Sequence, residues 1–169
     1  MKRLLFLIAL YLAVVIQISL GIPVASLGWD IDIVLLILVI ILCSTGAGEA
    51  ILWAALAGLA LDAFDPAAMG GHLVAKSTAI FALTFIRGSM NLDQPPLLAA
   101  AIFILTILDR LIYRLFSPYL SRFGTTFLRF DLPSAVLTAI FGFILLWALS
   151  RAGMISLGPG DKNRGKSPI

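Results

Sequence analysis

The sequence predicts an all-α, polytopic membrane protein with six transmembrane helices. Of its 169 residues, 61% are hydrophobic and only 12% are charged, which is more apolar surface than a soluble fold of this size can bury. The apolar residues fall into six runs separated by short breaks. A helix needs about 20 apolar residues to cross a bilayer core about 30 Å thick, so these runs indicate the number of spans.

The predicted spans follow one another with short connections, and the second to fourth are short for a membrane crossing. Proline stands in the first turn of the last two spans, where its missing amide hydrogen costs nothing. We expect one six-helix transmembrane domain over residues 1–151 and a disordered cytoplasmic tail over residues 152–169. The spans are Leu4–Gly21, Ile31–Thr45, Glu49–Phe64, Gly71–Ile86, Pro96–Phe116 and Pro133–Ser150.

Basic residues near both ends of the chain predict its orientation. Lys2 and Arg3 precede the first span, and Arg151 follows the last one, with three more basic residues in the tail. Because Lys and Arg concentrate on the cytoplasmic side, both termini are expected there, which requires an even number of spans. Arg122 and Arg129 conflict with this rule, because six spans place their loop outside. We interpret that loop as amphipathic or as a contact with a partner.

The residues that catalysis, metal binding or nucleic-acid binding would need do not occur in suitable patterns. The chain has one His and one Cys, so it lacks a Cys/His metal cluster, and it contains no phosphate-binding glycine motif and no basic stripe. His72 has no serine on a nucleophile elbow to activate. Polar residues gather near span ends, whereas a transporter places several near the midplane. We therefore expect a non-enzymatic protein without cofactor or metal.

Small residues recur at a spacing of four along several spans, which places them on one face of each helix. Such faces allow close helix packing in a membrane. They predict either packing within the bundle or a groove for a helix of another protein, and the sequence does not distinguish the two. The faces comprise Ala9, Ala13, Gln17 and Gly21; Ala50, Ala54, Gly58 and Asp62; Gly71, Ala75 and Ala79; and Ser134, Thr138 and Gly142.

Ionisable residues within spans are costly and therefore informative. Asp62 ends the third span and Lys76 lies early in the fourth, so the two are predicted to meet as an ion pair across the short loop. His72 lies one turn before Lys76 on the same face. Three roles remain open for this group: hydrogen bonds that anchor the loop, a proton relay or ligand site, and contact with a partner.

The fifth span carries its own charges in its second half. Arg110 and Arg114 share a face and are expected to reach toward lipid headgroups. Asp109 is expected to pair with an arginine of another helix. Glu49 is interpreted as a cap, because a carboxylate suits the positive end of a helix dipole.

The segment from about residue 30 to residue 75 resembles the rod shape-determining membrane protein MreD family. The resemblance rests on Asp32-Ile-Val-Leu-Leu36, Gly46-Ala-Gly48, Ala54–Asp62 and Pro66–His72. This sequence departs from the family pattern in having Ile31 where proline is usual before the aspartate, and Met69-Gly70 in place of Leu-Gly.

The resemblance implies a scaffold of the bacterial cell-elongation machinery in the inner membrane. Such a protein binds the single-span protein MreC and, through it, MreB, RodA and penicillin-binding protein 2, supporting cell shape and peptidoglycan synthesis. It further implies a fold similar to the substrate-binding subunits of energy-coupling-factor vitamin transporters. The candidate partner contacts are Ala54, Gly58, Asp62, His72 and Lys76. The lipid bilayer is also expected to surround the protein, and no nucleic acid is expected to bind.

The alternative is that the chain is itself such a vitamin-binding subunit. Ala9 and Ala13 resemble the Ala-x-x-x-Ala element with which those subunits dock their membrane partner. The short outer loops, poor in ligand-binding groups, favour the scaffold, because a vitamin pocket needs several placed polar contacts.

Overall fold

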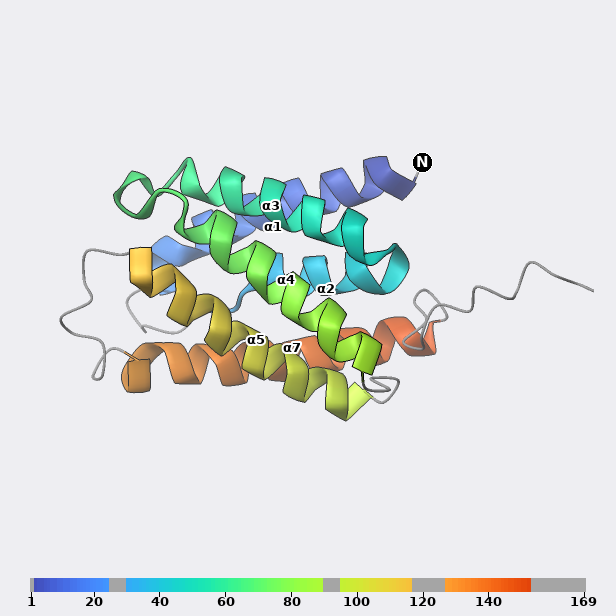
Figure 1. Cartoon of the computed structure of the whole chain (residues 1–169). Coiled ribbons are helices and arrows are strands. Elements are labelled where there is room, and N and C mark those ends of the chain that lie inside the picture. The colour runs from blue at the N-terminus through green and yellow to red at the C-terminus, as the bar shows by residue number, and fades with distance from the viewer. Residues whose placement is uncertain (1, 25–29, 90–94, 117–126, 153–169) are drawn as a thin grey trace, which may run out of the picture.

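The computed structural model describes residues 2–24, 30–89, 95–116 and 127–152. These residues are almost entirely helical and contain no strand (Figure 1). Six α-helices account for most of them, together with one short 3₁₀ helix and one short π-helix. In chain order the elements are α1 Lys2–Val24, α2 Ile33–Ser44, α3 Ala47–Asp62, η1 Pro66–Ala68, α4 Gly71–Ser89, α5 Pro95–Phe116, η3 Phe127–Asp131 and α7 Leu132–Arg151.

Six helices were predicted, and each lies where its apolar run is. The observed ends differ from the predicted ends by no more than three residues. Two helical stretches, Pro96–Phe116 and Phe127–Arg151, are long and apolar enough to cross a membrane by length and composition. The apolar stretches Arg3–Ser19 and Ile33–Ser44 are shorter. The all-α class is therefore confirmed. The predicted tail and Arg122 lie outside the described residues.

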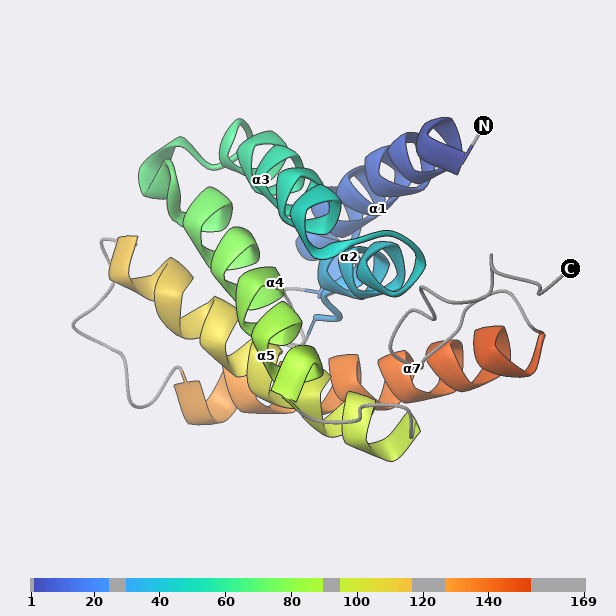
Figure 2. The ribbon, with the colours of Figure 1, turned by 45° about the vertical axis from the view of Figure 1, so that its right-hand side comes forward.

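The helices run alternately between two ends of the bundle. The N-terminus, the α2–α3 turn and the C-terminal end of α7 lie at one end, on the right of Figure 1, and η1 lies at the other. Both views place α3 beside α4, and α5 beside α4 and α7 (Figure 2). This order puts the start of α5 at the same end as the N-terminus.

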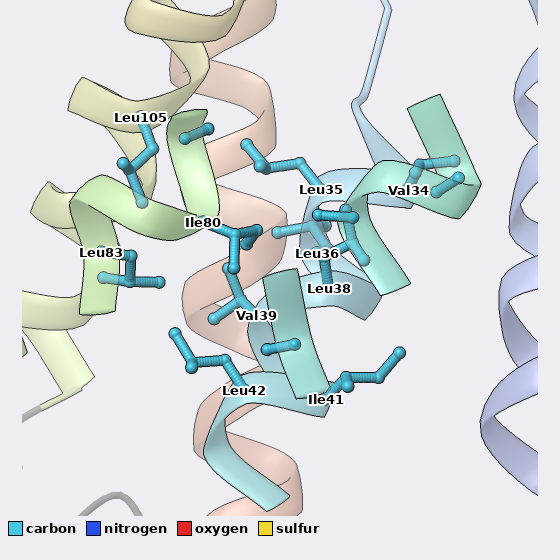
Figure 3. Close-up of a cluster of buried hydrophobic side chains, with 14 of the residues drawn as sticks. Val34, Leu35, Leu36, Leu38, Val39, Ile41, Leu42, Ile80, Leu83 and Leu105 are labelled. Carbon is cyan, nitrogen blue, oxygen red and sulfur yellow. The ribbon is translucent and has the colours of Figure 1, made fainter. Parts of the chain in front are cut away.

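Helix α2 forms the centre of the bundle. It contacts α1, α3, α4 and α7, and it is apolar all round, as a buried helix must be. Ile80 of α4 lies among its side chains, with Leu83 and Leu105 beyond (Figure 3). The buried α2 residues are Val34, Leu35, Leu36, Leu38, Val39, Ile41 and Leu42.

Helix α2 has only 12 residues, which at a rise of about 1.5 Å per residue gives a length of about 18 Å. It is thus the shortest of the six α-helices. Its N-terminal end lies inside the protein, because Val34 and Leu35 are fully buried. A buried helix end carries backbone amides without partners in the helix, and these amides require acceptors from elsewhere.

The outer surface of the bundle is apolar. Large exposed hydrophobic side chains occur on α1, α3, α4, α5 and α7, although α2 has none. Examples are Leu5 on α1, which is 65% exposed, Leu52 on α3 and Phe81 on α4. Soluble monomers seldom expose so much contiguous apolar surface. The charged side chains Asp32, Asp62, Lys76, Asp109 and Asp131 are buried instead.

Candidate functional site: a buried charge cluster

The buried start of α2 is supported by side chains from three parts of the chain. Asp32 caps the helix, its Oδ1 accepting a hydrogen bond of 2.9 Å from the Leu35 amide. Gln17 of α1 accepts at 3.0 Å from the Val34 amide through its Oε1. On the other side, the backbone N–H of Asp32 donates to Thr138 Oγ1 of α7 at 3.1 Å. The backbone amides that lack partners within the helix thereby gain partners elsewhere in the protein.

Lys76 joins the α2 cap to α5. Its ammonium group donates hydrogen bonds to Asp32 and to Asp109 Oδ2, the second at 2.9 Å. The three side chains are buried, with Lys76 at 1% exposure. An ammonium group can stay charged in such a place only when carboxylates compensate it. We call Asp32, Lys76 and Asp109 the inner cluster.

A second set of charges lies beside the inner cluster, and we call it the outer cluster. Arg110 of α5 contacts Asp30 at 2.7 Å, and its other terminal nitrogen lies 4.0 Å from Asp131. Arg114 contacts Asp131 at 2.6 Å. These pairs fasten the C-terminal half of α5 to the segment before α2 and to the start of α7.

These contacts correct two predictions about α5. Asp109 does not pair with an arginine of another helix, because its partner is Lys76 of α4. Arg110 and Arg114 do not extend outward, because each binds an aspartate within the protein.

Arg129 was predicted to lie in a loop, and in the structure it belongs to the helical element η3. Its side chain is exposed and lies over the ring of Phe130, 5.6 Å from the ring centre.

The predicted ion pair between Asp62 and Lys76 is wrong. Asp62 instead accepts hydrogen bonds from the backbone amides of His72 and Leu73, at 2.9 and 3.0 Å. A carboxylate there satisfies amides at the positive end of α4. The hydrogen bonds that anchor the loop, one of the three roles left open, are therefore confirmed for Asp62.

His72 lies between the loop and the inner cluster. Its ring stacks on Tyr113 of α5 with centroids 4.3 Å apart, and Tyr113 donates a hydrogen bond to Asp65 beside η1. The His72 Nδ1 atom is buried without a hydrogen-bond partner. This stack and the Asp62 cap fix the α3–α4 connection against the end of α5.

Four of the five predicted partner contacts are buried, and the fifth is half-buried. Ala54, Asp62 and Lys76 are at most 4% exposed. A Cβ atom built on Gly58 would lie 2.5 Å from the Leu73 Cα, so α3 and α4 touch through their backbones there. His72 is half-buried. The small-residue face of α3 is used for packing within the bundle, and its direct contact with a partner helix is not supported.

Glu49 was interpreted as a helix cap, and it does lie in the first turn of α3. Its side chain also contacts Arg3 of α1 at 2.9 Å. Arg3 is 82% exposed, and exposed pairs of this kind contribute little to stability. The pair lies at the bundle end opposite η1.

An open groove runs between α5 and α7 on the outer surface, with a volume of about 350 Å³. Its lining is entirely apolar and includes the small residues Ala99, Ala100 and Ala139. The sequence did not predict this groove, because its shape depends on how α5 and α7 pack against each other. Its lining residues are Pro96, Ala99, Ala100, Phe103, Val136, Ala139, Ile140 and Phe143.

Among the described residues, no three His, Cys, Asp or Glu side chains are grouped so that they would hold a metal ion. No protein-family model matches the chain, and neither a curated protein nor a solved structure matches it at a significant level.

Proposed function

We propose that the chain is a non-enzymatic integral membrane scaffold that crosses the bilayer six times, with both termini in the cytoplasm. The observation that carries the proposal is the inverted distribution of polarity. Large hydrophobic side chains are exposed on five helices, whereas Lys76 and four aspartates are buried. The hydrocarbon core of a membrane is the solvent that suits such a surface. Within a membrane, each charge buried in the protein needs a partner from the same protein.

The resemblance of residues 30–75 supports a specific role for this scaffold. We propose that it belongs to the bacterial cell-elongation machinery of the inner membrane and binds MreC, as MreD proteins do. Through MreC it would support MreB, RodA and penicillin-binding protein 2 in shaping the cell. Its bundle would resemble the substrate-binding subunits of energy-coupling-factor transporters in fold.

The groove between α5 and α7 is the surface that we propose for the MreC helix. A single-span helix has an apolar surface and packs best against small residues, where backbones approach closely. The groove presents Ala100 and Ala139 on an apolar, open face. The small face of α3, by contrast, is covered by α4. We therefore move the proposed contact from α3 to α5 and α7.

A filled groove tests this assignment. Ala100 is exposed and lines the groove, so Ala100→Phe should fill it without disturbing the interior and should weaken co-purification with MreC. Ala148→Phe is the matched control, because Ala148 is exposed on α7 and does not line the groove. Equal MreC recovery for both variants would exclude the groove, and no recovery with the native chain would exclude the scaffold.

The vitamin-transporter alternative has less support. Ala13 of the proposed docking element is 2% exposed and packs in the core, which removes it from a docking face. The α5–α7 groove offers no polar side chain to a vitamin, and a vitamin pocket needs several placed polar contacts. Mass spectrometry of the purified protein tests this reading, since a bound vitamin would support it.

A further inference from the structure

The two charge clusters differ in their balance. In the outer cluster, Arg110 and Arg114 bring two positive charges to Asp30 and Asp131. In the inner cluster, one ammonium group contacts two carboxylates. If every aspartate were ionised, the inner cluster would carry one uncompensated negative charge inside the bundle, which is costly at low dielectric.

The two carboxylates of the inner cluster are not equally supported. Asp32 accepts hydrogen bonds at both oxygens, one from Lys76 and one from the Leu35 amide. Asp109 accepts only at Oδ2, from Lys76, and its Oδ1 is buried without a partner. Its side chain is 4% exposed, so bulk water does not compensate this oxygen. Burial without hydrogen bonds favours the neutral form of a carboxyl group.

We propose that Asp109 holds a proton at neutral pH and that the inner cluster is a proton-binding site in the bundle interior. The resting state is then an ionised Asp32, a charged Lys76 and a neutral Asp109, with no net charge. The proton is taken from water, and no other reactant is involved. This inference goes beyond the scaffold function and does not depend on it.

The groups around Asp109 act in opposite directions. Lys76 of α4, which contacts the carboxyl group, and Arg110 of α5 favour its ionised form, whereas burial and the Asp32 charge at the start of α2 oppose ionisation. His72 lies one turn before Lys76 on α4. Helix α5 itself contributes Arg110, which is engaged by Asp30 and lies near Asp131 of η3.

Two further groups complete these surroundings. Helix α7 contributes the uncharged Thr138, which is bonded to the Asp32 amide. Asp62 of α3 is held by backbone amides. Within the described part of the chain, Lys76 is the one positive group in contact with the Asp109 carboxyl.

Infrared spectroscopy of the full chain in detergent micelles tests the proposal. At neutral pH the native protein should show the carbonyl stretching band of a protonated carboxylic acid. The band should vanish in Asp109→Asn and persist in Glu49→Gln, whose parent carboxylate is partly exposed and paired with Arg3. Absence of the band from the native protein, or its persistence in Asp109→Asn, would overturn the assignment.

Thermal unfolding gives a second readout. Asparagine resembles a protonated aspartate in shape and charge, so Asp109→Asn should leave the unfolding midpoint nearly unchanged. Asp32→Asn removes the ionised partner of Lys76 and should lower the midpoint clearly. Equal losses in the two variants would count against the proposal. If Asp109→Asn does not fold, Asp109→Glu decides, because it replaces the protonated aspartic acid by a glutamic acid and the band must then shift in frequency.

Discussion

Lys76 Nζ lies 2.9 Å from Asp109 Oδ2 and also contacts Asp32, so one ammonium group links α4, α5 and the start of α2. The contact explains how a helix as short as α2 can begin inside the protein, since its cap is held by a charge from a neighbouring helix.

Removing this ammonium group should be strongly destabilising. Lys76→Met leaves the Asp32 carboxylate buried without its cation, and breaking a buried pair in this way costs about 3–5 kcal/mol. We expect the free energy of unfolding in detergent to fall by that amount. Arg3→Gln is the control, because the exposed Arg3–Glu49 pair should contribute less than about 1 kcal/mol. Similar losses for both variants would contradict a structural role for the inner cluster.

The backbone contact between α3 and α4 predicts different results for two glycines of α3. A Cβ at position 58 would lie 2.5 Å from Leu73 Cα, whereas a Cβ at position 48 meets nothing within 4 Å. Gly58→Ala must move backbone and should cost about 1–3 kcal/mol. Gly48→Ala should instead stabilise the helix by about 0.5–1 kcal/mol. Chemical denaturation of the two variants in mixed micelles measures both, and a stable Gly58→Ala would refute the close approach.

Gly142 of α7 is expected to tolerate alanine better than Gly58 does. A Cβ there would lie 2.8 Å from Leu36 Cδ2 and 3.0 Å from Ile102 Cδ1, which are the flexible ends of side chains. These tips can rotate, so Gly142→Ala should cost about 1 kcal/mol and less than Gly58→Ala. The order of the two unfolding midpoints checks this, and a reversed order would show that α7 packs more rigidly on α2 than α4 packs on α3.

The Asp62 cap predicts a local effect at the start of α4. Asp62→Ala removes the acceptor for the His72 and Leu73 amides and should cost about 0.5–2 kcal/mol, as loss of a cap usually does. Asp62→Asn keeps one side-chain acceptor and should cost less. Hydrogen exchange followed by mass spectrometry should show faster exchange in the first turn of α4 in the alanine variant. Unchanged exchange there would mean that the cap is not maintained.

The sequence predicted the helices well because apolar runs of this length and proline positions report local structure directly. Pro133 and Pro95-Pro96 mark helix starts, and Asp65-Pro66 marks the loop before α4. The small face of α3 also predicted close packing, which Gly58 provides against α4. What remained open was whether that face met the chain's own helix or another protein.

The charge partners could not be predicted in the same way, because they depend on which helices are neighbours. Lys76 and Asp62 are close in sequence, which suggested a pair, yet Lys76 contacts residues 44 and 33 positions away. One feature of the sequence did indicate the buried cluster, namely the short apolar run that forms α2. A helix that begins inside the protein needs a capped and compensated end, and Asp32 stands at that end.

The most direct test of the membrane scaffold is the sidedness of the two ends of α3. In a Cys43→Ser background, Ala47→Cys and Ala67→Cys place single thiols at exposed positions before and after the helix. A membrane-impermeant maleimide applied to intact spheroplasts should label residue 67 and should label residue 47 only after permeabilisation. Equal labelling of the two positions before permeabilisation, or labelling of both only after it, would contradict a bundle that crosses the bilayer.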